Sequence, residues 1–341
     1  MPSSIDLSFS SLPAAGVLAL VLAFADPASA MSGCLDTAVQ VPSPPRALAM
    51  ADAALLEHQA FGGQTMDAEG RLTEVGDYEA EDTRRTANAM PPWQRVLGYW
   101  RAIDPQDSRL PSIVRFGGAR PADRRLLTQA LSQSAAASMQ NLGTGPDQGL
   151  DATGLHAAEV AVNRVAVIDS PWSAAFISWL ARRAGLSDEE FVFSEAHVDY
   201  AGAAWQAGVA ESLGQPTRSA MRACDLMRTP PRVGDLVCQA RGDGAGLDTF
   251  EKIGEVLATR PTGGDALPMH CDVVVAVDAT GFDTVGGNVA QSVTLRRLDF
   301  ARGTNLLDPS YLPEGCAVSG AASCIDRHMS RQPWTLLLQW R

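Results

Sequence analysis

The sequence contains very little lysine and no basic cluster. Lys252 is its single lysine, and its 27 basic and 39 acidic side chains give a formal net charge of −12. Nucleic acids and anionic lipid surfaces both attract clustered positive charge. The composition therefore argues against nucleic acid as a partner and against electrostatic docking on a membrane. It also leaves lysine-based covalent chemistry almost without a candidate.

Motifs for cofactors and metals are missing as well. The chain has no GxGxxG sequence and no phosphate-binding loop, so we expect no nucleotide cofactor. Its 5 histidines show neither HxxxH nor HExxH spacing, and its 6 cysteines form no CxxC pair. These are the spacings that zinc sites use. The sequence predicts neither a metal nor a cofactor.

The composition is that of a folded protein. With 341 residues, 46% hydrophobic and 19% charged, the chain has enough apolar surface for one large domain or two small ones. Its longest apolar run, residues 12–25, is shorter than the roughly 20 residues that span a bilayer. The run has the length of a signal-peptide core, and Ala28-Ser29-Ala30 resembles a cleavage site.

We expect residues 1–30 to be a signal peptide. The mature chain would then be exported to the periplasm or the envelope without a transmembrane helix. No positive charge precedes Arg46, which is unusual for such a peptide. An internal core helix, or translation from Met31, are the alternatives.

The cysteines fit an oxidising compartment. Their even number suits disulfides, and Cys316 and Cys324 bracket a short loop that a disulfide could close. The small residues before Cys34 also resemble a lipoprotein signal, which would acylate that cysteine. The break at Asp26-Pro27 argues against this second interpretation.

We predict three segments: the signal peptide, a linker and acidic, poorly ordered lead-in over 31–91, and a folded domain over 92–341. The lead-in includes a possible helix at 46–60 and an acidic run over 62–92, which is typical of a solvated loop rather than a metal site. Helices are expected at 93–100, 122–141, 152–168 and 195–206, and strands at 233–238, 271–277, 292–296 and 335–340. Helices followed by an antiparallel meander indicate an α+β fold.

One helix start could carry chemistry. Ser170 is a suitable N-cap, Pro171 fits the first helical position, and Gly185 fits the C-terminal end. Ser173 would then lie in the first turn, where free backbone N–H groups and the helix dipole stabilise an anionic nucleophile or an oxyanion. The alternative role for Ser173 is simple capping.

Two later residues complete a possible triad. His270 directly precedes the buried strand 271–277. Asn288 lies just past the next strand, where Thr284-Val285 leads into a turn at Gly286-Gly287-Asn288. A nucleophile at Ser173, a base at His270 and an orienting amide at Asn288 follow the general logic of nucleophilic catalysis. His270 could equally be a core histidine.

Other residues could line the same groove. Trp172, His197 and Tyr200 are candidates for substrate binding, although His197 could merely pack there. Successive strand residues point to opposite faces, so Cys271 should face away from the site if His270 faces it.

Several segments resemble known hydrolases. PWSAAFISWLARRAGL resembles the nucleophile helix of CHAP and NlpC-type papain-like hydrolases, and RVGDLVC and HCDVVVAVDATGFDTVGGNVAQSVTLRRL resemble their strands. The stretch from Trp93 to Trp340 resembles more closely the bacterial family catalogued as domain of unknown function 2272. The resemblance implies a papain-like helix-plus-antiparallel-sheet domain with extra N-terminal helices. It also makes the strands of Cys238 and Cys271 neighbours, either disulfide-bonded or carrying buried free thiols.

One departure from the papain-like pattern affects the expected function. Ser173 stands where that pattern has a cysteine, and a hydroxyl needs a well-placed base that a thiolate does not. We therefore expect an exported envelope hydrolase that cleaves an amide bond, with peptidoglycan peptide as its substrate. A non-catalytic envelope-binding module on the same fold and an acyl transferase are the alternatives.

Overall fold

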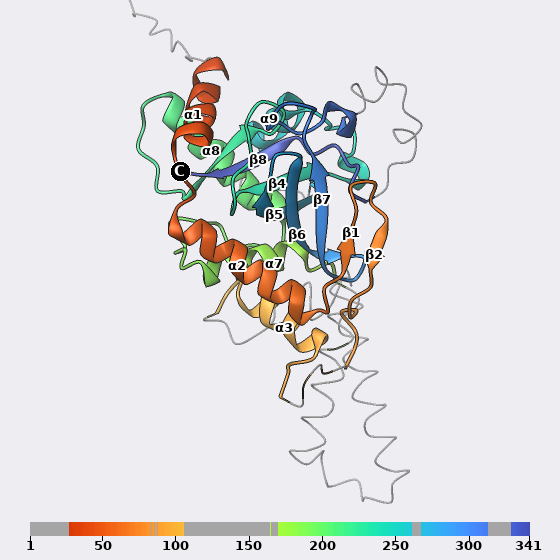
Figure 1. Cartoon of the computed structure of the whole chain (residues 1–341). Coiled ribbons are helices and arrows are strands. Elements are labelled where there is room, and N and C mark those ends of the chain that lie inside the picture. Colours follow the sequence, from red (N-terminus) through yellow and green to blue (C-terminus); the bar gives the residue numbers. More distant parts are fainter. Residues whose placement is uncertain are drawn as a thin grey trace, which may run out of the picture.

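The computed structural model describes residues 27–82, 84, 86, 88–105, 164, 170–260, 267–312 and 329–341. The apolar run 12–25, the expected helices at 122–141 and 152–168 apart from Arg164, and the Cys316–Cys324 pair lie outside these residues. The elements are shown in Figure 1. They are α1 (Pro27–Gln40), α2 (Pro45–Ala60), β1 (Thr65–Met66), β2 (Leu72–Glu74), α3 (Pro92–Arg101), α7 (Ser173–Arg183), α8 (His197–Ser212), β3 (Met221–Asp225), β4 (Leu236–Ala240), α9 (Phe250–Thr259), β5 (Met269–Val277), β6 (Gly281–Val289), β7 (Ser292–Asp299) and β8 (Leu336–Trp340), with short 3-10 turns at Gly242–Gly244 and Pro309–Tyr311.

The strands form one mixed sheet. Its order is β2-β1-β7-β6-β5-β4-β8-β3, and every neighbouring pair is antiparallel except β1 with β7. The predicted α+β class is confirmed. The β-branched run of β5 lies near the middle of the sheet, where β4 and β6 pair with its two edges, and all but its last two residues are buried.

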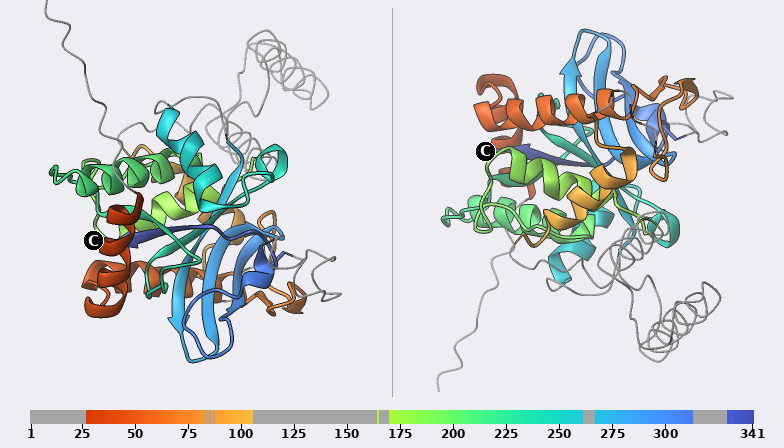
Figure 2. Two further views of the ribbon diagram at one scale, coloured as in Figure 1. Left: turned by 90° about the horizontal axis from the view of Figure 1, so that it is seen from above. Right: turned by 90° about the horizontal axis from the view of Figure 1, so that it is seen from below.

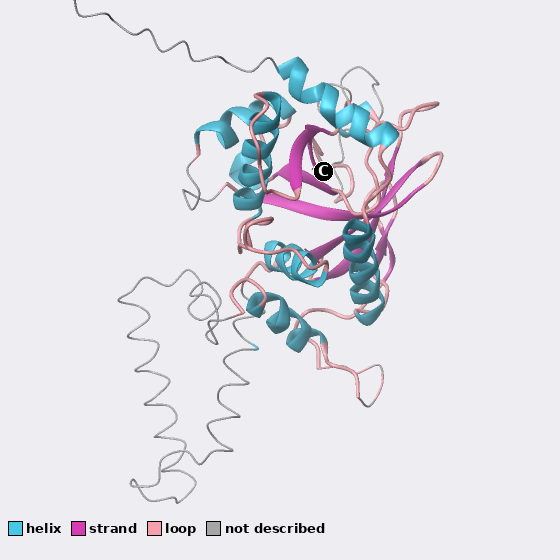
Figure 3. Cartoon of the chain, turned by 90° about the vertical axis from the view of Figure 1, so that its left-hand side faces the viewer, coloured by secondary structure: helices cyan, strands magenta, loops and turns pink. Residues whose placement is uncertain are grey.

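The helices form two groups around this sheet (Figures 2 and 3). Helices α2, α3 and α7 pack together, with α2 and α7 against β5 and β6. Helices α1 and α9 contact α8, which covers β3. No helix among the described residues is long and apolar enough to cross a membrane. The two groups meet where α7 and α8 begin.

Helix α7 differs from expectation at its start. Its N-cap is Trp172 rather than Ser170, so the helix begins at Ser173, two residues after Pro171. Its end agrees with the prediction, because Gly185 adopts the left-handed φ of 78° just beyond the helix. Its residues Phe176, Ile177 and Leu180 are fully buried in the main core, and Trp179 is partly buried against it.

The segment 31–91 is not a loosely ordered lead-in. Helix α2 buries Ala47, Met50 and Ala54 in the main core, and Gly234 passes so close that a Cβ there would lie 2.4 Å from the Ala47 carbonyl oxygen. The prediction failed because alanine-rich helices show little contrast between their apolar and polar faces. The folded unit therefore begins well before residue 92.

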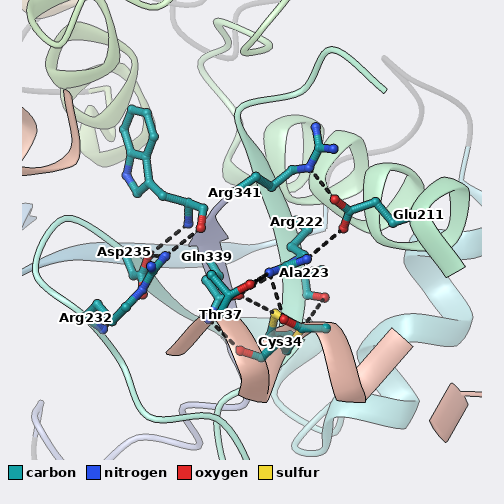
Figure 4. The surroundings of a disulfide bond; sticks show 12 residues. Cys34, Thr37, Glu211, Arg222, Ala223, Arg232, Asp235, Gln339 and Arg341 are labelled. Carbon is teal, nitrogen blue, oxygen red and sulfur yellow. Dashed lines mark hydrogen bonds and ion pairs between the residues drawn. A yellow bond between two sulfur atoms is a disulfide. The ribbon is translucent and has the colours of Figure 1, made fainter. Parts of the chain in front are cut away.

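Helix α1 is fastened to the sheet by a disulfide between Cys34 and Cys224 on β3 (Figure 4). Beside it, the Arg222 guanidinium donates to the Gln339 side chain and to the Gly33 carbonyl oxygen, the latter at 2.9 Å. The Gln339 amide donates to the Cys34 carbonyl oxygen at 3.0 Å. The Cys34 sulfur that a lipid would modify is thus bonded to another sulfur.

Removing this disulfide is expected to destabilise the protein. The two cysteines are 190 residues apart, whereas Cys238 and Cys271, paired directly across β4 and β5, are 33 apart. Closing a longer loop removes more entropy from the unfolded chain. We expect the double variant Cys34→Ser, Cys224→Ser to lose about 2–4 kcal/mol of unfolding free energy, measured by urea unfolding. Because its loop is longer, this loss should exceed that of the double variant Cys238→Ser, Cys271→Ser. An unchanged unfolding midpoint would contradict the assignment.

Candidate active site

Ser173 meets a histidine at the junction of two helix starts. It is the first residue of α7, and its Oγ lies 2.7 Å from Nε2 of His197, the first residue of α8. The N-cap Trp172 makes no side-chain capping bond, and the first-turn N–H groups of a helix have no partner within the helix. A hydroxyl, an imidazole and free backbone donors therefore converge on one point.

His197 is neutral near pH 7. Burial is the main cause that lowers the pKa of His197 well below 6.5, and the positive charge of Arg241 lowers it further. Its Nδ1 contacts the hydroxyl of Tyr200, whose own pKa burial raises well above 10. A neutral imidazole has one donor and one acceptor nitrogen. For Ser173 to donate its proton to Nε2, the ring proton must lie on Nδ1, with the Tyr200 oxygen as its acceptor.

A second histidine is held by a carboxylate. His270 Nε2 lies 2.8 Å from Asp272 Oδ1, two residues along β5. The other oxygen of Asp272 accepts from Thr284 at 2.9 Å and from Nε of Arg296 at 2.8 Å. All four side chains are buried.

The charges fix the tautomer of His270. Burial opposes ionisation of Asp272, but the charge of Arg296 and the hydrogen bond from His270 outweigh it, so the pKa of this carboxyl lies well below its usual value. Burial also lowers the pKa of His270, against the pull of Asp272. A neutral His270 must donate from Nε2 to the ionised carboxylate, which leaves a lone pair on Nδ1.

The two groups are neighbours, but they are not joined as expected. The rings of His197 and His270 lie 5.4 Å apart between centroids, in an edge-to-face arrangement. The hydrogen bond of Ser173 goes to His197, not to His270. The sequence therefore named Ser173, His197, Tyr200 and His270, which the structure brings together. The histidine in hydrogen-bond contact with Ser173 is His197 rather than the expected His270.

Asn288 does not orient His270. Its amide donates to Glu79 Oε2 at 2.6 Å, and the Trp172 indole N–H donates to the same oxygen at 2.5 Å. Asn288 adopts a left-handed φ of 57° where β6 bulges before its turn into β7, which sends its side chain toward Glu79. Trp172 is fully buried, so it is a core residue rather than a substrate platform.

Sequence reasoning missed the residues that support the site. Asp272 follows His270 by two positions on a strand, so both side chains share one face, and this spacing could have identified it. Glu79 was assigned to a solvated acidic loop, but it is buried, and burial raises its pKa despite the Trp172 and Asn288 hydrogen bonds. Nothing local in the sequence marks Glu79 or Arg296, because their partners are distant in the chain.

The glycines of the GGN sequence make room for the site. A Cβ on Gly286 would lie 2.0 Å from Asp272 Oδ1, and one on Gly287 would lie 2.6 Å from the Phe176 Cβ. The expected turn at these glycines is instead part of strand β6.

We expect Gly286→Ala to destabilise the protein by about 1–3 kcal/mol, since overpacking a buried site forces the neighbours to shift. Gly98→Ala is the control, because nothing lies within 4 Å of a Cβ there and alanine favours its helix. Thermal unfolding of the two variants compares them. Equal melting temperatures would contradict the close approach.

Among the described residues, no group of three or more His, Cys, Asp or Glu side chains is placed to hold a metal ion.

Comparisons with known proteins bear on the family of the chain. Neither the curated proteins nor the solved structures include one that matches this chain. A family model, described as "uncharacterized protein conserved in bacteria (DUF2272)", matches residues 87–340. The chain therefore belongs to this bacterial family of unknown function.

Proposed function

We propose that the protein is a serine-dependent hydrolase that cleaves an amide bond. The observation that carries the proposal is the 2.7 Å contact between Ser173 Oγ and His197 Nε2 at the uncapped start of α7. A nucleophile in hydrogen-bond reach of a neutral base, beside preorganised backbone donors, is the arrangement that acyl transfer needs.

In the proposed reaction, Ser173 Oγ attacks the substrate carbonyl carbon while its proton passes to His197 Nε2. The carbonyl oxygen becomes an oxyanion, which accepts hydrogen bonds from the N–H groups that begin α7. His197 then gives the proton to the leaving amine, and the carbon–nitrogen bond breaks. Water then attacks the acyl-serine while His197 takes its proton. The acid is released as His197 returns a proton to Ser173.

The second histidine supports this cycle electrostatically. The charge of Asp272 favours the protonated form of His197, which is the form that accumulates during attack. Asp272 is kept ionised by Arg296 and His270. We assign His270 and Asp272 to positioning and charge stabilisation, with Tyr200 fixing the His197 ring.

The substrate and location follow from the other features. A nucleophile at a helix start packed on a sheet, with a histidine on the central strand, supports a papain-like fold in which serine replaces cysteine. The two disulfides and the apolar run near the N-terminus support export to the periplasm or envelope. Peptidoglycan peptide is the substrate that we propose for an amide hydrolase there.

Digestion of purified peptidoglycan tests this function. We expect the unaltered protein to release new amino groups and soluble fragments, and Ser173→Ala to release none above background. Equal release by both proteins would show that Ser173 is not the nucleophile. No release by either, with binding retained, would support the second candidate.

That second candidate is a non-catalytic binding module. It is favoured by the closure of the site, where Ser173 is 3% and His197 4% exposed, so that a substrate must open the site to reach the hydroxyl. Calorimetry with soluble peptidoglycan fragments would then detect binding without product.

A further inference from the structure

Gln239 and Arg241 place an acceptor and a cation on the same side of the sheet as His270. Gln239 pairs directly with His270 across β4 and β5, and directly opposed residues of an antiparallel pair point to the same face. Arg241 continues this register, because its N–H donates to the Pro268 carbonyl oxygen at 2.9 Å and its backbone is extended. Its side chain therefore emerges on the same face.

Gln239 carries a hydrogen-bond acceptor that nothing in the described chain uses. The residue is 4% exposed, and its Oε1 is buried without a partner among the described residues. A buried polar atom without a partner costs about 1–3 kcal/mol, and such atoms are rare in folded proteins. An N–H group of a bound molecule would satisfy this oxygen.

Arg241 carries donors that are equally unused. Its Nε donates to the Met269 carbonyl oxygen at 3.1 Å, which fixes the guanidinium beside the residue that precedes His270. Its terminal nitrogens have no hydrogen bond or ion pair among the described residues, and the residue is exposed.

The charge of Arg241 reaches the site. Burial is the main cause of the low pKa of both histidines, and the positive charge of Arg241 lowers both further. The opposite charges of Asp272 and Arg296 offset each other in direct contact. Arg241 therefore leaves one unmatched positive charge at the edge of the site, in a protein of net charge −12.

We propose that Gln239 and Arg241 form a recognition subsite for a peptide that carries a free carboxylate, with Gln239 accepting a peptide N–H and Arg241 binding the carboxylate. An arginine fork matches a carboxylate in two parallel hydrogen bonds, which an amide cannot reproduce. Calling this peptide a substrate rests on the proposed hydrolase function, whereas the binding of a peptide carboxylate by the subsite does not.

The test measures binding by calorimetry in the Ser173→Ala background, where no turnover interferes. The probes are N-acetyl-Ala-Ala with a free carboxylate and the same dipeptide as its C-terminal amide. We expect the acid to bind about tenfold more tightly than the amide. Arg241→Gln should abolish that preference, and Gln239→Leu should weaken both probes by a similar factor.

Arg297→Gln is the charge-matched control. Arg297 pairs with Asp278 and Asp283 near the β5–β6 turn, at the end of β5 far from His270, so the preference for the acid should persist. Equal binding of acid and amide, no binding of either, or a preference that survives Arg241→Gln would overturn the subsite. If the acid is preferred but the unaltered protein does not cleave peptidoglycan, the result supports the subsite and rejects the hydrolase function.

Discussion

Replacing His197 by alanine is expected to slow acylation of Ser173 by about 10³-fold, the scale of losing a positioned general base. The reason is the direct contact between Nε2 and the serine hydroxyl, for which no other described residue substitutes. The rate is measured as burst-phase release of nitrophenol from a nitrophenyl ester, which needs no knowledge of the natural substrate. Since the pKa of His197 is lowered, the rate of the unaltered protein should fall only at pH values below 6.5.

His270→Gln separates the two histidines. Because Gln keeps a donor for Asp272 and His270 has no hydrogen bond to Ser173, we expect a loss of only about tenfold. Tyr200→Phe should likewise cost about tenfold or less, because it removes only the acceptor of the ring proton. A larger loss in His270→Gln than in His197→Ala would show that His270 is the base and that the substrate rearranges the site.

Asp272→Asn is expected to lower the free energy of unfolding by about 3–5 kcal/mol. The substitution preserves size but leaves the buried guanidinium of Arg296 without its counter-charge, and an unpaired buried charge is the costly outcome. Urea unfolding at pH 7 measures it. Asp283→Asn on neighbouring β6 is the control. Its partner Arg297 and Asp283 itself are 22% and 29% exposed, so the loss should stay within about 1 kcal/mol.

The same pair predicts a dependence on pH. The folded-state pKa of Asp272 is lower than its unfolded value of about 4, so the folded protein holds the proton less tightly. Its contribution is complete above that unfolded value and is lost as the pH falls toward the folded one. The stability difference between the unaltered protein and Asp272→Asn should therefore shrink below pH 4. A difference that is constant from pH 7 to pH 3 would contradict the ion pair.

The strongly periodic elements could be predicted from sequence. The stripe of Trp93, Val96, Leu97 and Trp100 gave α3, and the β-branched run after Cys271 gave β5. Local signals were enough there because burial imposes a regular pattern on residues close in sequence. The helix at 46–60 was also predicted and is α2, but its burial in the core was not, because its alanines give little hydrophobic contrast between its faces.

The site was predictable as a set of residue types but not as a set of contacts. Ser173 and His270 stood out because each lies at the start of a predicted element. The choice between His197 and His270 depends on how α7 and α8 approach each other, which no local pattern encodes. Glu79 is the clearest case, since its partners Trp172 and Asn288 lie 93 and 209 residues away.

The central claim is that Ser173 is an activated nucleophile, and reaction with a fluorophosphonate probe tests it most directly. We expect one adduct per folded protein, located at Ser173 by peptide mass mapping, and none in Ser173→Ala. The labelling rate should fall in His197→Ala and remain unchanged in Ser310→Ala, a distant control on a 3-10 turn. A folded protein that stays unlabelled, or that is labelled elsewhere while Ser173 stays free, would contradict the account.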